Sequence, residues 1–202
     1  MTQEAKAALR ARLIAARRAL APSQRADASF AIAGRVAALP AFARARRVAL
    51  YAPMGAEVDT SELARLTVEA GKEIAWPRMV PDVPPGTRRM DFASCDFRQL
   101  EPGPGSIRQP PPAAPAVSLA SIDLACVPGV GFDLGLHRLG RGGGNYDSVL
   151  TATPGSAARG LVVGLAFDVQ VVPALPVEPH DAPVDLVVTE SRIIEPGAGR
   201  RG

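Results

Sequence analysis

The sequence predicts an α/β fold with a mostly parallel sheet that is covered on both faces. The main observation is a set of short apolar, β-branched runs at residues 47–52, 73–77, 122–128, 161–167 and 184–189. Several of these runs lack polar alternation, which is typical of parallel strands buried on both faces. A second observation is a helix-forming segment between the first two runs. Strand, helix and strand in this order form a right-handed crossover unit.

Two helices are expected before the first strand, within residues 4–40. Residues 4–20 place apolar side chains such as Leu13 beside arginines at three-to-four-residue spacing, which predicts an amphipathic helix. A second helix is predicted over residues 23–39, because Pro40 stops it.

The crossover helix is predicted within residues 59–72. Asp59 and Glu62 have the spacing of a capping box at its start, and Gly71 is a typical stop signal at its end. The strands of runs 47–52 and 73–77 are therefore expected to lie side by side and parallel.

Residues 81–115 contain nine prolines and are not expected to form a regular helix or a central strand. They suit either a domain linker or a surface excursion with a short hairpin around residues 90–97. The flanking strands continue one sheet, which favours the excursion and a single domain over residues 1–202. The tail after Glu195 is expected to be frayed.

The charge is concentrated at one end of the chain. The formal net charge is +3, but residues 1–50 hold ten basic and two acidic residues, a local +8. A basic nucleic-acid-binding module is one interpretation, although it calls for interleaved aromatic side chains. This segment offers only Phe30 and Phe42, both at core-like positions. No nucleic-acid partner is therefore expected.

The location expected for the protein is the cytoplasm. Its two cysteines, Cys95 and Cys126, have neither a disulfide framework nor zinc-ligand spacing, which suits a reducing compartment. No run approaches 18 apolar residues, so no membrane partner is expected. The arginine-rich start also allows a transit peptide, but Glu4 and the lack of serine argue against one.

A glycine-rich loop within residues 127–150 is the strongest candidate for a binding site. Three successive glycines, 142–144, leave the backbone N–H groups open to an anion, and a helix predicted from about Asn145 adds its positive end. Arg138 and Arg141 add charge-assisted donors. These features predict a phosphate cradle; the alternative is a simple turn that joins strand to helix.

Standard nucleotide motifs do not fit this loop. A Walker loop requires Gly-Lys followed by Ser or Thr, but Gly71-Lys72 is followed by Glu73. A dinucleotide fingerprint that starts at Gly140 would require glycine at Asn145.

Four segments in order resemble the 5-formyltetrahydrofolate cyclo-ligase family over nearly the whole chain. Lys6, Leu9 and Arg10 match a KxxLR start of the first helix. The others are YAPMGAEVDT (51–60), PGVGFD (128–133) continuing into RLGRGGGNYD (138–147), and LAFDVQVVPALPVEPHDAPVDLVVTE (165–190). The resemblance implies a three-layer α/β/α sandwich with a mostly parallel, Rossmann-like sheet.

The resemblance also implies a reaction. It is the ATP- and Mg²⁺-dependent cyclisation of 5-formyltetrahydrofolate to 5,10-methenyltetrahydrofolate, in which the formyl oxygen is phosphorylated and ADP and phosphate are released. Catalysis of phosphoryl transfer rests mainly on positioning and charge neutralisation. This suits a chain with only two histidines.

The resemblance assigns roles to individual residues. Arg138 and Arg141 would be catalytic, and Arg78 is a further phosphate candidate. The Mg²⁺ ligands would be Asp147 and Asp181, and the folate pocket would include Ala52, Glu57, Arg141, Gly142, Gly143, Gly144 and Asn145. The ATP site would be formed by Lys6, Arg10, Arg138, Leu139, Gly140, Arg141, Gly142, Gly143, Gly144, Asn145 and Tyr146. The other arginines of the first 50 residues are interpreted as helix surface.

The sequence departs from the family pattern at two positions. Asn145 stands where an aromatic residue is usual, and Ser148 where a basic residue is common. We expect altered folate affinity with function retained, and the alternative is a catalytically altered folate- or nucleotide-binding paralogue. The expected oligomeric state is a monomer or weak dimer.

Overall fold

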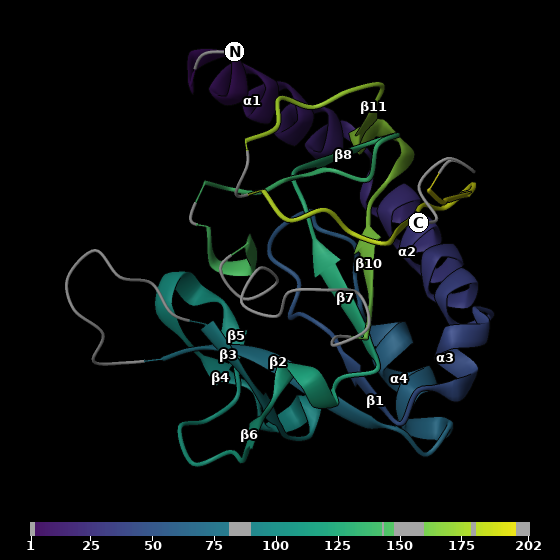
Figure 1. Cartoon of the computed structure of the whole chain (residues 1–202), viewed down its shortest axis with the longest axis vertical. Helices are drawn as coiled ribbons and strands as arrows, with labels where there is room; N and C mark the ends of the chain where they lie inside the picture. The colour runs from purple at the N-terminus through teal and green to yellow at the C-terminus, as the bar shows by residue number, and fades with distance from the viewer. Residues whose placement is uncertain (1–2, 81–89, 143, 148–159, 179–180, 197–202) are drawn as a thin grey trace.

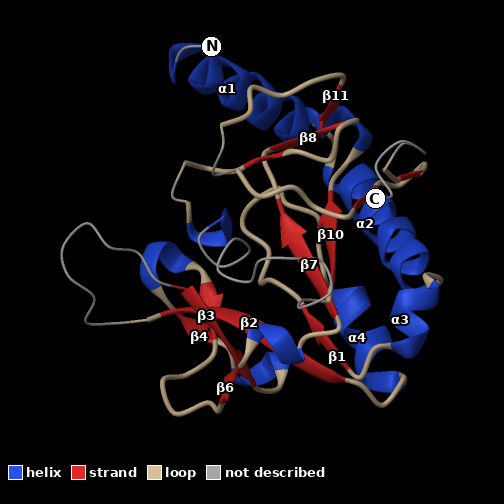
Figure 2. Cartoon of the chain, in the orientation of Figure 1, coloured by secondary structure: helices blue, strands red, loops and turns tan. Residues whose placement is uncertain are grey.

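The chain folds around a large sheet, shown in a computed structural model that describes residues 3–80, 90–142, 144–147, 160–178 and 181–196 (Figures 1 and 2). Over these residues the sheet has eight strands in the order β13-β12-β10-β7-β1-β2-β3-β6. Their bounds are β1 Arg47–Ala49, β2 Glu73–Met79, β3 Met90–Ser94, β6 Ala116–Val117, β7 Leu124–Pro128, β10 Leu161–Leu165, β12 Leu186–Val188 and β13 Ile193–Ile194. The five neighbours from β12 to β2 are parallel, which confirms the predicted mixed α/β class.

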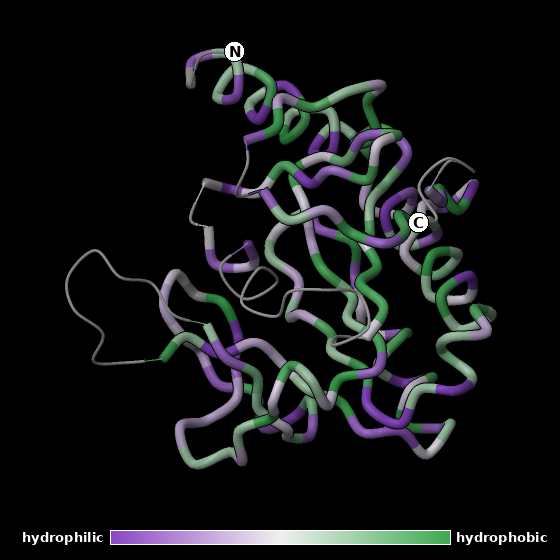
Figure 3. The backbone as a smooth tube through the Cα atoms, in the orientation of Figure 1, coloured by the Kyte–Doolittle hydropathy of each residue, from purple (hydrophilic) through white to green (hydrophobic). Residues whose placement is uncertain are grey.

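The parallel strands are buried on both faces, as their unbroken apolar runs predict. In β7, Leu124 and Cys126 belong to one hydrophobic cluster, whereas Ala125 and Val127 belong to the cluster on the opposite face. All four residues are at most 3% exposed. Successive side chains of a strand point to opposite faces, so burial of both sets requires a layer on each side. Hydropathy colouring shows the apolar character of β7 and β10 (Figure 3).

One face of the sheet is covered by helices. These are α2 (Pro22–Ala37), α3 (Pro40–Arg44) and α4 (Ser61–Glu69), which lie together beside the sheet (Figure 2). The first helix, α1 (Gln3–Ala19), lies instead across the end of the sheet (Figure 1). It packs there on the 3₁₀ turn η4 (Asp168–Gln170).

The helix predicted over residues 23–39 is α2, which ends at Ala37, before Pro40 as expected. Pro40 also opens the short α3, because proline is well tolerated in a first helical turn. The predicted capping box of α4 is wrong. Glu62 pairs with Arg65 at 2.6 Å, and Asp59 accepts a hydrogen bond from the Ser61 backbone N–H at 2.9 Å. Gly71 ends the segment with φ of +69°, as expected for a glycine stop.

The proline-rich segment contributes to the main sheet. Its proline-free stretch forms β3, which lies between β2 and β6 and pairs antiparallel with β2. The prediction that this segment forms no central strand is therefore wrong at β3. The expected hairpin around 90–97 is instead this β2–β3 pairing. Smaller elements follow, namely η1 (Phe97–Gln99), β4 (Glu101–Pro102), η2 (Pro104–Ser106), β5 (Arg108–Gln109) and η3 (Leu119–Ser121). Residues 81–89 lie outside the described part.

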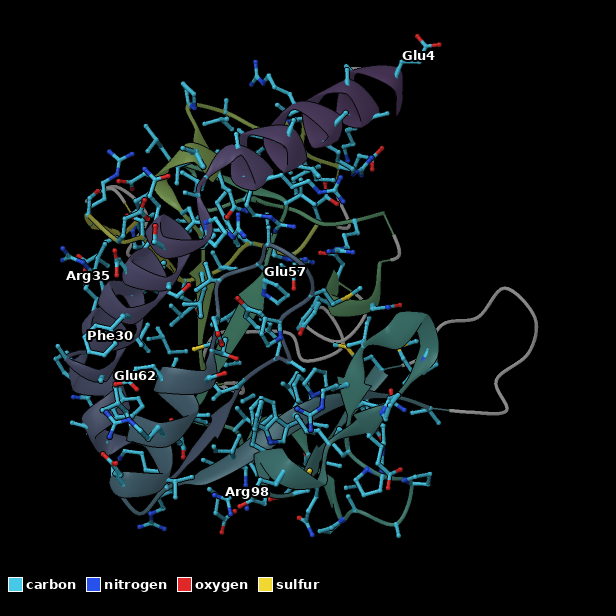
Figure 4. All side chains as sticks on the ribbon, turned by 180° about the vertical axis from the view of Figure 1, so that it is seen from behind. Glu4, Phe30, Arg35, Glu57, Glu62 and Arg98 are labelled. Carbon is cyan, nitrogen blue, oxygen red and sulfur yellow. The ribbon has the colours of Figure 1, made fainter. Side chains whose placement is uncertain are left out.

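The aromatic residues divide between core and surface. Trp76 and Phe132 are at most 1% exposed, and Phe42 is 5% exposed. Phe30 is 65% exposed and points away from α2 (Figure 4), so its expected place in the core is wrong. Among the described helices, none is both long and apolar enough to cross a membrane.

A second, smaller sheet carries the binding loop. Its order is β11-β8-β9, formed by Val171–Val172, Gly131–Asp133 and Arg138–Leu139. Phe132 of β8 packs against the main sheet on the face opposite α2 and α4. Its ring fits only because two neighbours are glycines. An added Cβ would lie 2.6 Å from the ring at Gly129 and 2.4 Å at Gly164.

Replacing Gly164 with alanine is therefore expected to destabilise the fold. The added methyl meets a fully buried ring, and overpacking of this kind lowers the free energy of unfolding by about 1–3 kcal/mol. A urea titration with unchanged slope measures the effect. Gly34→Ala is the control, because Gly34 is in α2 with nothing within 4 Å of the new methyl. A Gly164→Ala midpoint at or above that of the unmodified protein would contradict this packing.

Candidate active site

A cavity of about 280 Å³ lies at the carboxyl ends of β1, β2 and β7. The chain runs from β1 to β2 on one side and later places β7 on the other side of β1, so the strand order reverses here. Such switch points are the usual ligand sites of open α/β sheets. The cavity is lined by Tyr51, Ala52, Met54, Glu57, Pro77, Arg78, Met79, Met90, Ile107, Gln109, Pro128, Gly129, Val130, Arg138, Gly140, Arg141, Gly144, Asn145, Tyr146 and Asp147.

Arg138 is buried at one wall of the cavity. Its Nη2 donates to Asp147 Oδ1 at 2.7 Å, and its guanidinium lies 5.4 Å from the centre of the Tyr146 ring. Only 4% of its side chain is exposed. Gly140 allows this close packing, because a Cβ there would lie 3.1 Å from Arg138 Nη1. The sequence-predicted Arg138, Tyr146 and Asp147 are thus brought together.

The glycine loop adopts backbone conformations that favour glycine. Gly142 and Gly144 have φ of +94° and +65°, in the left-handed region. Residues 145–147 are helical, in agreement with the helix predicted from about Asn145. Asn145 lines the cavity, and its Nδ2 lies 3.7 Å from Met79 Sδ. Gly143 and Ser148 lie outside the described residues.

Glu57 and Arg141 form an ion pair across the cavity. Arg141 Nη2 donates to Glu57 Oε1 at 3.1 Å, and the Met54 backbone N–H donates to Glu57 Oε2 at 3.0 Å. The Glu57 side chain is 9% exposed, whereas that of Arg141 is 51% exposed. Figure 4 shows Glu57 in the interior, below α1. Ala52, which the resemblance also places in the folate pocket, is 7% exposed and lines the same cavity.

The first helix brings Arg10 to the loop. Arg10 Nε donates to the Gly140 carbonyl at 2.9 Å. This contact joins the two segments that the resemblance assigns to ATP, and it shows that Arg10 is more than a solvated helix residue. Leu139, also assigned to ATP, is buried and contacts the apolar cluster under α1.

Lys6 contacts the carboxylates of the C-terminal segment. Its Nζ donates to Glu178 Oε2 at 2.7 Å and to Asp181 Oδ2 at 3.2 Å. Burial lowers the pKa of Lys6, but the hydrogen bonds to Glu178 and Asp181 outweigh it and raise the pKa above its usual value. The ammonium group is therefore charged. Lys6 and Asp181 are brought together here, although neither lines the cavity.

The carboxylates expected to bind Mg²⁺ are each paired with a cation. Asp147 pairs with Arg138, and Asp181 with Lys6. Over the part of the chain that the structure describes, no three or more His, Cys, Asp or Glu side chains form a group that could hold a metal ion. Mg²⁺ commonly uses one or two carboxylates together with phosphate oxygens. Asp147, with its hard oxygens at the cavity wall, fits such a role.

Arg78 has an extensive set of structural contacts. Its guanidinium pairs with Asp91 at 3.0 Å and donates to the carbonyls of Pro111, Pro112 and Ala114. These bonds tie β2 to the proline-rich segment. Arg78 lines the cavity, but its contacts favour a structural role, and its phosphate role stays a prediction.

Arg17 is the residue that the sequence interpretation missed. It is 4% exposed, so its interpretation as helix surface is wrong. Its Nη1 donates to the Gly129 carbonyl at 3.4 Å, directly at the end of β7. Burial lowers the pKa of Arg17, and the charge of Glu57 opposes that shift. The signal in the sequence is its position on the same helix face as Leu13, which is 3% exposed.

The cavity wall also carries two neutral phenols. Burial raises the pKa of Tyr51 and of Tyr146 well above the usual tyrosine value. Tyr51 donates its hydroxyl proton to the Val58 carbonyl at 3.1 Å. The cavity combines guanidinium groups with the carboxylates of Glu57 and Asp147 and with apolar side chains from Met54, Met79 and Met90, which suits an anionic group beside a flat organic ring.

Three comparisons relate the chain to known proteins. The model of the 5-formyltetrahydrofolate cyclo-ligase family matches residues 2–190. The 5-formyltetrahydrofolate cyclo-ligase of Mus musculus is 31% identical over 195 residues, covering 92% of this chain and 94% of the mouse protein. The protein of the same name from Escherichia coli K12 is 31% identical over 188 residues, covering 89% of this chain and 97% of the bacterial one.

A solved structure agrees with the sequence relatives. The NMR structure of the Aquifex aeolicus 5,10-methenyltetrahydrofolate synthetase superimposes with a TM-score of 0.81 at 31% identity, covering 98% of this chain and 95% of that one. The family model spans more than nine-tenths of the sequence, and the relatives match nearly end to end. The resemblance drawn from the four motifs is confirmed, and the chain belongs to the 5-formyltetrahydrofolate cyclo-ligase family.

Proposed function

We propose that this enzyme closes 5-formyltetrahydrofolate to 5,10-methenyltetrahydrofolate with the conversion of ATP to ADP and phosphate. The observation that carries the proposal is the arrangement of Arg138, Arg141 and Glu57 around one cavity at the switch point of the sheet. Two guanidinium groups suit a transferring phosphoryl group, and a carboxylate suits the N–H donors of a pterin ring.

The reaction we propose has two steps. The formyl oxygen attacks the γ-phosphorus of ATP, the bond to ADP breaks, and an activated formyl phosphate ester of the folate forms. The neighbouring folate N–H nitrogen then attacks the formyl carbon and closes the ring, its proton passes to solvent, and phosphate leaves with the former formyl oxygen. A formamide oxygen is a poor leaving group, and phosphorylation makes it a good one.

In this proposal, the side chains of the protein orient the phosphate groups and neutralise their charge. Arg138 is held rigidly by Asp147 and Tyr146, so its charge is positioned before the reaction and costs little reorganisation during it. Arg141 is half exposed and is free to turn from Glu57 towards a phosphate. Arg10 holds the glycine loop through the Gly140 carbonyl, and we assign the backbone N–H groups of this loop to the phosphates.

We assign Mg²⁺ to Asp147, with Asp181 as a further ligand after separation from Lys6. A divalent cation there would neutralise charge on the β- and γ-phosphate oxygens. Asp147 lines the cavity and pairs with Arg138 at 2.7 Å, which supports a role for this carboxylate and this guanidinium at one phosphate group.

Incubation with ATP, Mg²⁺ and 5-formyltetrahydrofolate tests the proposal. We expect the methenyl chromophore and ADP to appear in equal amounts, and neither to appear when one reactant is left out. Binding of both ligands without formation of either product would contradict the proposed reaction. It would favour the ligand-binding paralogue suggested by Asn145. Failure to bind 5-formyltetrahydrofolate at all would remove the folate assignment.

A further inference from the structure

Gln109 is a polar residue of the cavity wall to which neither the family resemblance nor the proposed reaction gives a role. It belongs to β5 of the proline-rich segment and lines the cavity together with Ile107 and Met79. The strand β5 packs against β2 at this point. Ligand cavities are mostly apolar and carry a few polar groups that orient the ligand, so this amide has either a structural or a recognition role.

One end of the Gln109 amide is fixed by the backbone of β2. The Met79 N–H donates to Gln109 Oε1 at 3.0 Å. Only the oxygen of an amide accepts such a bond, so this contact also identifies the other end as the Nε2 donor. Within the part of the chain that the structure describes, Nε2 donates to no protein acceptor and is not sealed from solvent.

Gly103 fixes the same amide by close packing. An added Cβ at Gly103 would lie 2.5 Å from Gln109 Cδ and 2.9 Å from Oε1, so only glycine leaves room for the amide. Gly103 is itself held in place, because its N–H donates to the Ile107 carbonyl at 2.8 Å. The amide is therefore fixed by a hydrogen bond and by packing, and its donor end is unused. A donor fixed in advance loses little conformational freedom when a ligand binds.

Printed contacts connect Gln109 to the assigned folate pocket. Met79, whose backbone N–H binds Gln109, has its Sδ 3.7 Å from Nδ2 of Asn145. All three residues line the same cavity. The guanidinium groups of this cavity suit charged phosphate oxygens, whereas a neutral amide N–H suits a neutral carbonyl oxygen.

We propose that Gln109 is a substrate-recognition residue whose Nε2 donates a hydrogen bond to a carbonyl oxygen of the folate. This inference rests on the proposed function, because it takes the cavity as the folate site. The folate has carbonyl oxygens on its formylated pterin ring and on its benzoylglutamate part. The competing explanation is a purely structural tether between β5 and β2 through the Met79 N–H.

Gln109→Glu separates the two explanations. A carboxylate oxygen still accepts a hydrogen bond from the Met79 N–H, but the Nε2 donor is replaced by an oxygen that repels a carbonyl. Gln109→Met removes the donor and the acceptor without adding charge. Gln99→Glu is the matched control, because Gln99 Oε1 accepts a backbone N–H from Asp96 at 2.9 Å but is exposed and does not line the cavity. The dissociation constants for 5-formyltetrahydrofolate and for ATP, kcat, KM and the thermal midpoint are measured for each.

If Nε2 recognises the folate, Gln109→Glu raises the dissociation constant and KM for 5-formyltetrahydrofolate about tenfold or more, and its thermal midpoint stays close to that of the unmodified protein. Gln109→Met raises the same constants about fivefold to tenfold, affects ATP binding much less, and lowers the thermal midpoint because the tether is lost. Gln99→Glu leaves folate binding unchanged.

A 5-formyltetrahydropterin without the benzoylglutamate part identifies which carbonyl is bound. Weaker binding of this compound to Gln109→Glu assigns the bond to the formylated ring. Normal binding of this compound, with weaker binding of the whole folate, assigns the bond to the benzoylglutamate carbonyl.

Three results overturn the inference. One is unchanged folate binding in Gln109→Glu, which leaves only the tether. Another is equal weakening of ATP and folate binding by Gln109→Met, which shows a general disturbance of the cavity. The third is absence of folate binding and turnover in the unmodified protein, which rejects the proposed function and this inference together. In the first two cases turnover by the unmodified protein leaves the proposed function standing.

Discussion

Replacing Asp147 with asparagine is expected to reduce kcat by roughly 100- to 1000-fold, the effect of removing one group that stabilises charge in a transition state. The substitution keeps the size of the side chain but removes the carboxylate that pairs with Arg138 at 2.7 Å and that we assign to Mg²⁺. Formation of the methenyl chromophore and of ADP at saturating substrates measures the loss.

Stability is expected to change much less than turnover in this variant. Arg138 loses its counterion, but the Asp147 side chain is 19% exposed, so solvent limits the loss to about 1–2 kcal/mol. Urea unfolding measures this value, and Asp96→Asn is the control, because Asp96 caps the distant turn η1. Turnover within a factor of three of the unmodified protein would remove Asp147 from the site.

The second large effect is expected for Arg138→Lys, with kcat/KM for ATP lowered by roughly 100-fold or more. Lysine keeps the positive charge but loses the planar fork that contacts Asp147 and stacks on Tyr146. The lysine side chain also has a shorter reach, so its hydrogen bonds orient the bound phosphate less well. Steady-state rates over a range of ATP concentrations give the value.

Arg12→Lys is the control for this substitution, because Arg12 is an exposed arginine of α1. It is expected to leave the kinetics unchanged. Near-normal turnover by Arg138→Lys would show that charge alone suffices at this position and that the guanidinium geometry is unimportant. Combining Arg138→Lys with Asp147→Asn is expected to cost less than the sum of the single effects, because the two residues form one pair.

The parallel core of the fold was predictable because it depends on local periodicity. Each of the five apolar runs became one of the parallel strands β1, β2, β7, β10 and β12, since a run without polar positions can be buried only between two layers. The inner strand β3 was missed. The many prolines in residues 81–115 argue against a central strand, but the five residues of β3 contain none and can therefore pair on both sides.

The helix caps show the limit of short-range patterns. The spacing of Asp59 and Glu62 suits a capping box, yet Glu62 has a closer opposite charge in Arg65 one turn along the helix. At the start of α4, Thr60 donates its hydroxyl to the Tyr51 carbonyl at 2.7 Å instead. The Thr60 hydroxyl is therefore used in a tertiary contact with the segment after β1 and does not cap α4.

The sequence by itself determined the positions of the parallel strands, the glycine loop with its two arginines, and the family. Each of these features depends on contiguous residues or on motifs in a fixed order. Only the tertiary structure decided which partners the basic residues of α1 contact, and that Arg17 is buried among them. Lys6, Arg10 and Arg17 share the helix face of Leu13 and meet Asp181, Gly140 and Gly129, which lie 112 to 175 residues away. Burial of that apolar face draws the three cations inward, and no local pattern specifies the partners they find there.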